Sequence, residues 1–235
     1  MVVRDQISYM LDRDLGVDTE HLIMLPIFAP SRESNAVHAN RLSTRYTTVK
    51  QSFLSHPNVL QATASKYRAF PGGGGTQSKP IRPENLPGDD WRILVNEVDE
   101  NFITTMGIDL IAGKNFTPGK GNPRRAFTGE FLINESAAKL FGWDGPIGKQ
   151  IERLDGGGGS GTVVGVFKDY HFDSLKEKIA PLALIQWTRL YAYLTLKIKG
   201  GQFVETMAFL ETQWQKFVPN VAFNPVFMDD GLESA

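Results

Sequence analysis

The segment Asp169-Tyr170-His171-Phe172-Asp173 carries the residue types best suited to metal chemistry. In an extended segment alternate side chains point to the same face, so Asp169, His171 and Asp173 would share one side. Carboxylate oxygens and an imidazole nitrogen can hold a divalent ion, and a metal-dependent hydrolase is one interpretation of this segment. A strand end with one polar and one aromatic face has the same pattern, and no second histidine cluster lies nearby in sequence. We therefore expect a structural role here, with no bound metal.

A glycine-rich segment at 155–161 has the spacing of a nucleotide-binding motif but the wrong neighbours. Gly156, Gly158 and Gly161 satisfy G-x-G-x-x-G, and a dinucleotide site requires a strand before these glycines and a helix after them. A predicted strand at 162–166 follows instead, which favours a hairpin loop. The sequence has no P-loop, no G-x-S-x-G elbow and no cysteine, which excludes the corresponding nucleotide, hydrolase and thiolate sites. We expect no enzymatic activity and no cofactor.

The charges are balanced, with 25 basic and 26 acidic residues and a formal net charge of −1. Such a chain has no overall electrostatic footprint for nucleic acid. The acidic group Glu97, Asp99 and Glu100 stands at the end of a predicted strand, where carboxylates cap helices or solvate loops. No acid and base stand out in opposed environments, so catalysis by a carboxylate pair is not indicated.

The 235 residues, of which 41% are hydrophobic, suffice for one large globular domain or two small ones. The longest stretch without a polar residue is Leu22–Pro30. It is far shorter than the roughly 20 residues that a membrane-spanning helix needs.

Two β-α-β patterns lie at the ends of the chain, after a short predicted helix at 5–15. Apolar alternation predicts strands, and apolar spacing of three and four predicts helices. The first unit comprises strand 21–28, helix 37–53 and strand 58–67, and the second comprises strand 190–198, helix 203–217 and strand 221–228. We expect one antiparallel sheet with both helices on one face, the split β-α-β arrangement.

The region between these units has shorter elements. Residues 70–87 are rich in Gly, Pro and polar residues and read as a hinge or loop. The predicted elements are strand 91–98, helix 99–106 with Asp99 as its N-cap, helix 134–140 capped by Asn134 and ended by Gly142, and strands 147–154 and 162–168. The chain is therefore expected to be α+β, with a small β-rich lobe inserted into the β-α-β lobe.

Five ordered segments of this middle region resemble the motifs of one permease family. They are VDENF (98–102), AGKNF (112–116), LINESAA (132–138), GPIGK (145–149) and VGVFKDYHFDSL (164–175). They are similar to the extracytoplasmic core domain of MacB/FtsX-type ABC transporter permeases, and residues 6–16 resemble Bacteroidetes-type members. Lys114 stands where the family usually has arginine.

The resemblance implies two lobes. Residues 1–68 and 182–235 would form the porter-like lobe, residues 88–170 the inserted lobe, and residues 69–87 and 171–181 the two crossings between them. Asp169, His171, Phe172 and Asp173 would then lie at the lobe junction. Both ends of the chain would lie close together and face the same bilayer surface.

The same resemblance implies a function. The chain would be a non-catalytic domain on the periplasmic side of the inner membrane, relaying ATP-driven movement of membrane helices or docking a partner or substrate. Its partners would be a separate ATPase subunit or domain, a second permease copy or homologue, and a periplasmic adaptor or substrate, but no nucleic acid. The alternative is a free-standing periplasmic binding or adaptor module.

Overall fold

The computed structural model describes residues 21–27, 46–68, 76–88, 91–120, 127–155, 158–172, 178–187, 191–200, 203–219 and 221–228. The described part holds, in chain order, β1 (Leu22–Pro26), α3 (Tyr46–Leu54), β2 (Val59–Ser65), β3 (Gln77–Pro83), β4 (Arg92–Val98), α4 (Phe102–Thr105), β5 (Leu110–Gly113), β6 (Gly129–Asn134), α5 (Glu135–Phe141), β7 (Gln150–Arg153), β8 (Gly159–Phe167), β9 (Leu182–Gln186), β10 (Tyr193–Ile198), α6 (Phe203–Phe217) and β11 (Val226–Phe227). The expected α+β class is confirmed. The predicted helix at 5–15, the start of the helix predicted at 37–53, and Asp173 lie outside the described residues.

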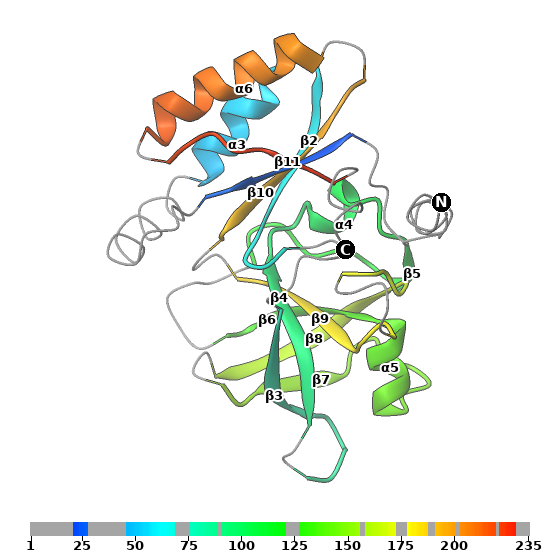
Figure 1. Cartoon of the computed structure of the whole chain (residues 1–235). Helices are drawn as coiled ribbons and strands as arrows, with labels where there is room; N and C mark the ends of the chain where they lie inside the picture. Colours follow the sequence, from blue (N-terminus) through cyan, green and yellow to red (C-terminus); the bar gives the residue numbers. More distant parts are fainter. Residues whose placement is uncertain are drawn as a thin grey trace, which may run out of the picture.

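The first lobe is an antiparallel sheet in the order β11-β1-β10-β2, with α3 and α6 on one face (Figure 1). Side chains of β1 alternate between the two faces, and Ile23 and Leu25 point to the side covered by the helices. There they share a core with Phe53 of α3 and with Trp214 of α6. The arrangement agrees with the split β-α-β sheet that the sequence pattern predicts, although β11 is only two residues long.

The second lobe is a closed ring of strands. Going around it, β4 pairs with β3, β3 with β7, β7 with β8, β8 with β6, β6 with β9, and β9 returns to β4. Two of these pairings, β6–β8 and β4–β9, are parallel, and the others are antiparallel. The interior is filled by side chains that include Ile81, Val95, Ile133, Ile151 and Ile185. Closure leaves these six strands with few free edges, while β5 adds to β8 outside the ring.

Two strands of this ring were not predicted as such. Residues 77–83 were expected to be loop, yet they form β3, because Ile81 is completely buried in the barrel and the strand pairs on both sides. Leu182–Gln186 forms β9 and pairs with β4 and β6 of the second lobe. The lobe boundaries stay a prediction, and this pairing favours crossings at 66–76 and 187–192 over those at 69–87 and 171–181.

A glycine fixes how β8 begins. Gly159 has a φ of +106°, and a Cβ on it would lie 2.2 Å from the backbone oxygen of Phe127. Only glycine tolerates both conditions. The antiparallel pairing of Arg153 with Gly159 makes β7 and β8 the predicted hairpin, but β8 begins at Gly159, earlier than the strand predicted at 162–168.

The two lobes share an apolar core, here called the junction cluster. On the face of β1 opposite the helices, Leu22 and Met24 pack into it. From the second lobe and α4 come side chains that include Phe102, Met106, Phe167, Tyr170, Phe172 and Leu184. The lobes are therefore packed against each other as well as connected by the chain.

Candidate functional site

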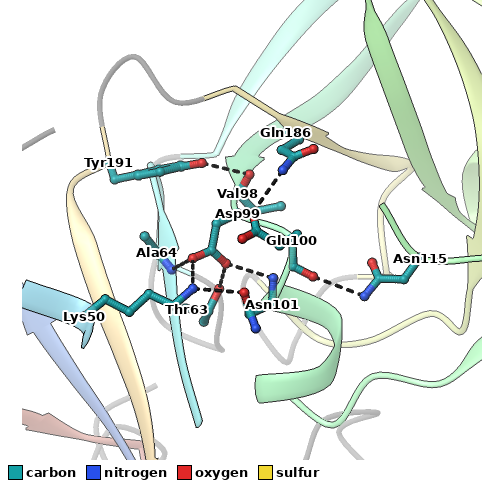
Figure 2. A network of polar contacts seen from close by, with 10 residues as sticks. All are labelled: Lys50, Thr63, Ala64, Val98, Asp99, Glu100, Asn101, Asn115, Gln186 and Tyr191. Atoms are coloured by element: carbon teal, nitrogen blue, oxygen red, sulfur yellow. Dashed lines mark hydrogen bonds and ion pairs between the residues drawn. The ribbon is translucent and has the colours of Figure 1, made fainter. Parts of the chain in front are cut away.

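Asp99 stands where the two lobes meet. It follows β4 directly and is completely buried. Its carboxylate accepts hydrogen bonds from Lys50 Nζ at 2.6 Å, Thr63 Oγ1 at 2.5 Å and the backbone N–H of Ala64 at 3.1 Å (Figure 2). These three donors belong to α3 and β2 of the first lobe. A residue at the end of a second-lobe strand is therefore held by the first lobe.

Lys50 is the charge partner of Asp99. The exposed fractions of the two side chains are 7% and 1%. A second bond from Lys50 Nζ reaches Asn101 Oδ1 at 3.0 Å, and the N–H of Asn101 returns to Asp99 at 3.1 Å (Figure 2). Burial raises the pKa of Asp99 because the charged form loses its hydration, while Lys50 and Thr63 act in the opposite direction. The Lys50–Asp99 pair is thus buried, and its hydrogen bonds go to defined partners.

Asp99 does not cap α4 as the sequence predicted. The N-cap of α4 is Asn101, whose side chain makes no capping bond. Asp99 lies two residues earlier, and its carboxylate accepts the N–H of Asn101 as well as the donors of the first lobe. The prediction that Asp99 caps the helix is wrong because α4 begins after Asn101, and a solvated role is wrong for Asp99 because it is buried and paired with Lys50.

Further polar contacts lie near Asp99, where the chain crosses between the lobes. Lys66 Nζ lies 2.6 Å from Glu97 Oε1, and Tyr191 donates its hydroxyl to the carbonyl oxygen of Val98 at 3.1 Å. At the end of β9, Gln186 Nε2 donates to Glu100 Oε2 at 2.9 Å (Figure 2). Lys66 is the first residue of the 66–76 crossing, Gln186 directly precedes the 187–192 crossing, and Tyr191 lies within it. We call the ten residues drawn in Figure 2 the Asp99 network: Lys50, Thr63, Ala64, Val98, Asp99, Glu100, Asn101, Asn115, Gln186 and Tyr191.

Backbone pairing between the lobes is slight by comparison. β2 and β4 share one register pair, Ser65 with Val98. Side chains therefore provide most of the polar contact between the lobes.

Two tyrosines near the crossings have raised pKa values. Desolvation raises the pKa of Tyr191 far above its usual range, so its hydroxyl stays a neutral donor. Burial, followed by the charge of Glu97, raises the pKa of Tyr67 to about 12.

The sequence-predicted junction residues fall in different places. Asp169 accepts from the N–H and the hydroxyl of Ser136, at 3.0 and 2.6 Å, so it binds the first turn of α5 within the second lobe. His171 is half-buried. Phe172 is 4% exposed, lies in the junction cluster and packs edge-to-face on Tyr170. A junction role for these residues stays a prediction, and only Phe172 is in a cluster shared with the first lobe.

The metal site considered from the sequence includes Asp173, which lies outside the described residues. Among the residues that the structure describes, there is no group of three or more His, Asp or Glu side chains that could hold a metal ion. The carboxylate of Asp169, one of the three predicted ligands, is occupied by Ser136.

Sequence reasoning missed the Lys50–Asp99 pair, although one signal was present. The buried residues of α3 are Val49, Lys50 and Phe53, so Lys50 lies on the apolar face of the helix. A lysine on a buried face requires an acidic partner. Its partner is 49 positions away, and no local pattern identifies it.

Comparisons with known proteins address the whole domain. The family model of the MacB-like periplasmic core domain matches residues 29–209. The chain belongs to this family. A comparison with curated protein sequences found no match.

Two solved structures agree with this family assignment in fold. The periplasmic region of MacB from Actinobacillus actinomycetemcomitans is similar with a TM-score of 0.61 and 13% identity, covering 94% of this chain and 95% of that one. The extracellular domain of the noncanonic ABC-type transporter YknZ from Gram-positive bacteria has a TM-score of 0.55 and 16% identity, covering 86% and 97%. The fold is thus that of the MacB periplasmic domain.

The family assignment fixes the broad function. This MacB-like domain is the extracytoplasmic domain of an ABC transporter permease, a class that works with ATPase subunits. None of the helices in the described residues has both the length and the apolar character to cross a membrane.

Proposed function

We propose that this MacB-like domain relays movement of the membrane part of its permease outward as one stiff, non-catalytic unit. Movement would enter through β1 and β11, the first and last described strands, which pair with each other at Ile23 and Phe227. The membrane would be the inner membrane, with this domain on its periplasmic side. A separate ATPase subunit or domain would supply the energy, and a second permease copy would be the moving counterpart.

The observation that carries this proposal is the burial of β1 on both faces. Ile23 and Leu25 pack against the helices of the first lobe, while Leu22 and Met24 pack into the junction cluster. A displacement of β1 therefore acts on both cores at once. Close-packed cores are hardly compressible and transmit such a displacement.

The Asp99 network supports the same role. A buried ion pair adds little net stability, because desolvation offsets the attraction, but it favours one orientation of its partners. Asp99 receives three bonds from the first lobe while it continues β4 of the second. Rotation of one lobe against the other would break several of these bonds together, so the lobes should move as one.

Spin-label distances in the full-length permease test the proposal. This domain has no cysteine, so introduced cysteines label specifically once any cysteines elsewhere in the permease are replaced by serine. Leu60→Cys in β2 and Ile147→Cys in the second lobe replace side chains that are 53% and 45% exposed. A matched control pair, Leu60→Cys with Val204→Cys, lies within the first lobe.

We expect the Leu60–Ile147 distance to be unchanged between the nucleotide-free and the ATP-trapped transporter, as for the control pair. The distance between Leu60 labels on two permease copies should change. A changed Leu60–Ile147 distance would show that the domain bends between its lobes. Unchanged distances between copies would exclude a relay and favour a passive docking module.

A further inference from the structure

A groove lined by polar and glycine residues lies on the outside of the second lobe. Its volume is 520 Å³, within the range of small-molecule sites. Three strands contribute to its lining: Thr128 and Glu130 lie at the start of β6, Gln150 is in β7, and Thr162 is in β8. The other lining residues are Lys114, Lys120, Gly129, Ser160, Gly161 and Val164.

The floor of the groove is a tightly packed strand pair. Gly129 and Gly161 face each other in the parallel register of β6 and β8. A Cβ on Gly161 would lie 2.6 Å from the oxygen of Gly129 and 2.7 Å from the ring of Phe127. The backbones of β6 and β8 are therefore close-packed beneath the groove, and a side chain at position 161 would not fit.

Glu130 organises the basic end of the groove. It is 5% exposed, and its carboxylate accepts the N–H and the hydroxyl of Thr117, at 2.6 and 2.9 Å, and Lys120 Nζ at 3.1 Å. Burial alone would raise the pKa of Glu130, but these bonds together lower it, so Glu130 is ionised at neutral pH. Lys120 is thereby held at the groove with two further N–H donors unused.

The charge of the second lysine, Lys114, is available to a ligand in the groove. Lys114 is exposed and lines the groove. Within the described residues, no acidic side chain pairs with its ammonium group. Two ammonium groups with one buried carboxylate leave this end of the groove with a net positive charge.

The rest of the lining offers hydroxyl and amide groups. Gln150 Nε2 donates to Thr162 Oγ1 at 2.7 Å, which leaves the Thr162 hydroxyl hydrogen and the Gln150 carbonyl oxygen for a ligand. Ser160 is exposed beside them. This part of the groove therefore both donates and accepts hydrogen bonds.

We propose that this groove binds an anionic saccharide. Its carboxylate or phosphate group contacts Lys114 and Lys120, and its hydroxyl groups exchange hydrogen bonds with Gln150, Ser160 and Thr162. A bare inorganic anion would satisfy the lysines but leave most of the groove empty. This proposal is independent of the relay.

Titration of the ¹⁵N-labelled 235-residue chain, followed by ¹H–¹⁵N spectra, tests it. The probes are glucose 6-phosphate, a tetragalacturonate, glucose and inorganic phosphate. We expect both anionic saccharides to shift the amides of residues 128–130 and 160–164, and glucose to bind at least tenfold more weakly. Tighter binding of tetragalacturonate would identify a polymeric glycan as the source, and tighter binding of glucose 6-phosphate a free phosphorylated sugar.

Variants make the test specific. Lys114→Gln should weaken binding about tenfold, Lys114→Arg should retain it, and Lys216→Gln, on α6 of the first lobe, should have no effect. Thr162→Val should weaken saccharide binding without changing the weak response to inorganic phosphate. The proposal is overturned if no probe shifts these amides, or if inorganic phosphate binds as tightly as glucose 6-phosphate, which would mean an adventitious ion only.

Discussion

Removing Lys50 should lower the free energy of unfolding far more than removing an exposed cation does. In Lys50→Met the carboxylate of Asp99 remains buried, with only Thr63, Ala64 and Asn101 as donors. Loss of one partner from a buried pair costs about 3–5 kcal/mol in the free energy of unfolding, because the remaining charge is uncompensated. The control for an exposed cation is Arg82→Met, which removes the 45% exposed partner of the 42% exposed Glu152 and should cost about 1 kcal/mol or less.

The double variant Lys50→Met/Asp99→Asn separates the charge from the packing. With both charges gone, no buried ion remains, so the double variant should be more stable than Lys50→Met alone by about 2 kcal/mol. Guanidinium unfolding, followed by the fluorescence of the four tryptophans, which lie in the cores of both lobes, measures each free energy.

The pH dependence of the free energy of unfolding provides a second, independent test. Burial raises the pKa of Asp99 above 3.8 in the folded state, so the folded chain binds this proton more readily than the unfolded chain does. Stability attributable to Asp99 therefore increases as the pH falls from above the folded pKa toward 3.8. In Lys50→Met the rise in pKa should be larger, so its deficit relative to the parent should shrink between pH 7 and pH 5.

Three results would refute this reasoning. The first is a Lys50→Met cost no larger than that of Arg82→Met. The second is strict additivity of Lys50→Met and Asp99→Asn. The third is a Lys50→Met deficit that does not change with pH.

Three further predictions concern other parts of the fold. Gly159→Ala should cost at least about 2 kcal/mol through the clash with Phe127 and the positive φ, whereas Gly119→Ala, with φ +76° but open space around it, should cost about 1 kcal/mol by thermal unfolding. Asn134→Ala removes the acceptor for the N–H groups of Ala137 and Leu182, so it should cost about 2 kcal/mol in denaturant unfolding, and a loss below 0.5 kcal/mol would contradict the double role. His171→Ala should raise amide exchange at residues 169–172 and 178–181 without unfolding either core, and unchanged or globally lost protection would show that His171 is not a junction residue.

Local patterns determined most elements of this domain. The spacing of apolar residues at 203–217 predicts α6 with the same bounds as in the structure. Asn134 and Gly142 cap α5 as predicted, with Asn134 accepting from Ala137 N and Gly142 in the left-handed region. Such features depend on contacts between residues three or four positions apart, which a single stretch of sequence contains. The family motifs likewise lie in continuous segments, and the family match confirmed the resemblance.

Long-range pairing was decided only by the tertiary structure. β3 contains two prolines and follows a glycine run, so its sequence favours a loop, and it is a strand because β4 and β7 lie on either side of it. The acidic residues at the end of β4 favour an exposed or helix-capping position in the sequence pattern. Asp99 is buried instead, because Lys50 reaches it from a helix 49 positions earlier. Closing the ring of strands and pairing these two charges both depend on bringing distant segments together. The energy of such contacts depends on burial and geometry, which the local order of residue types does not encode.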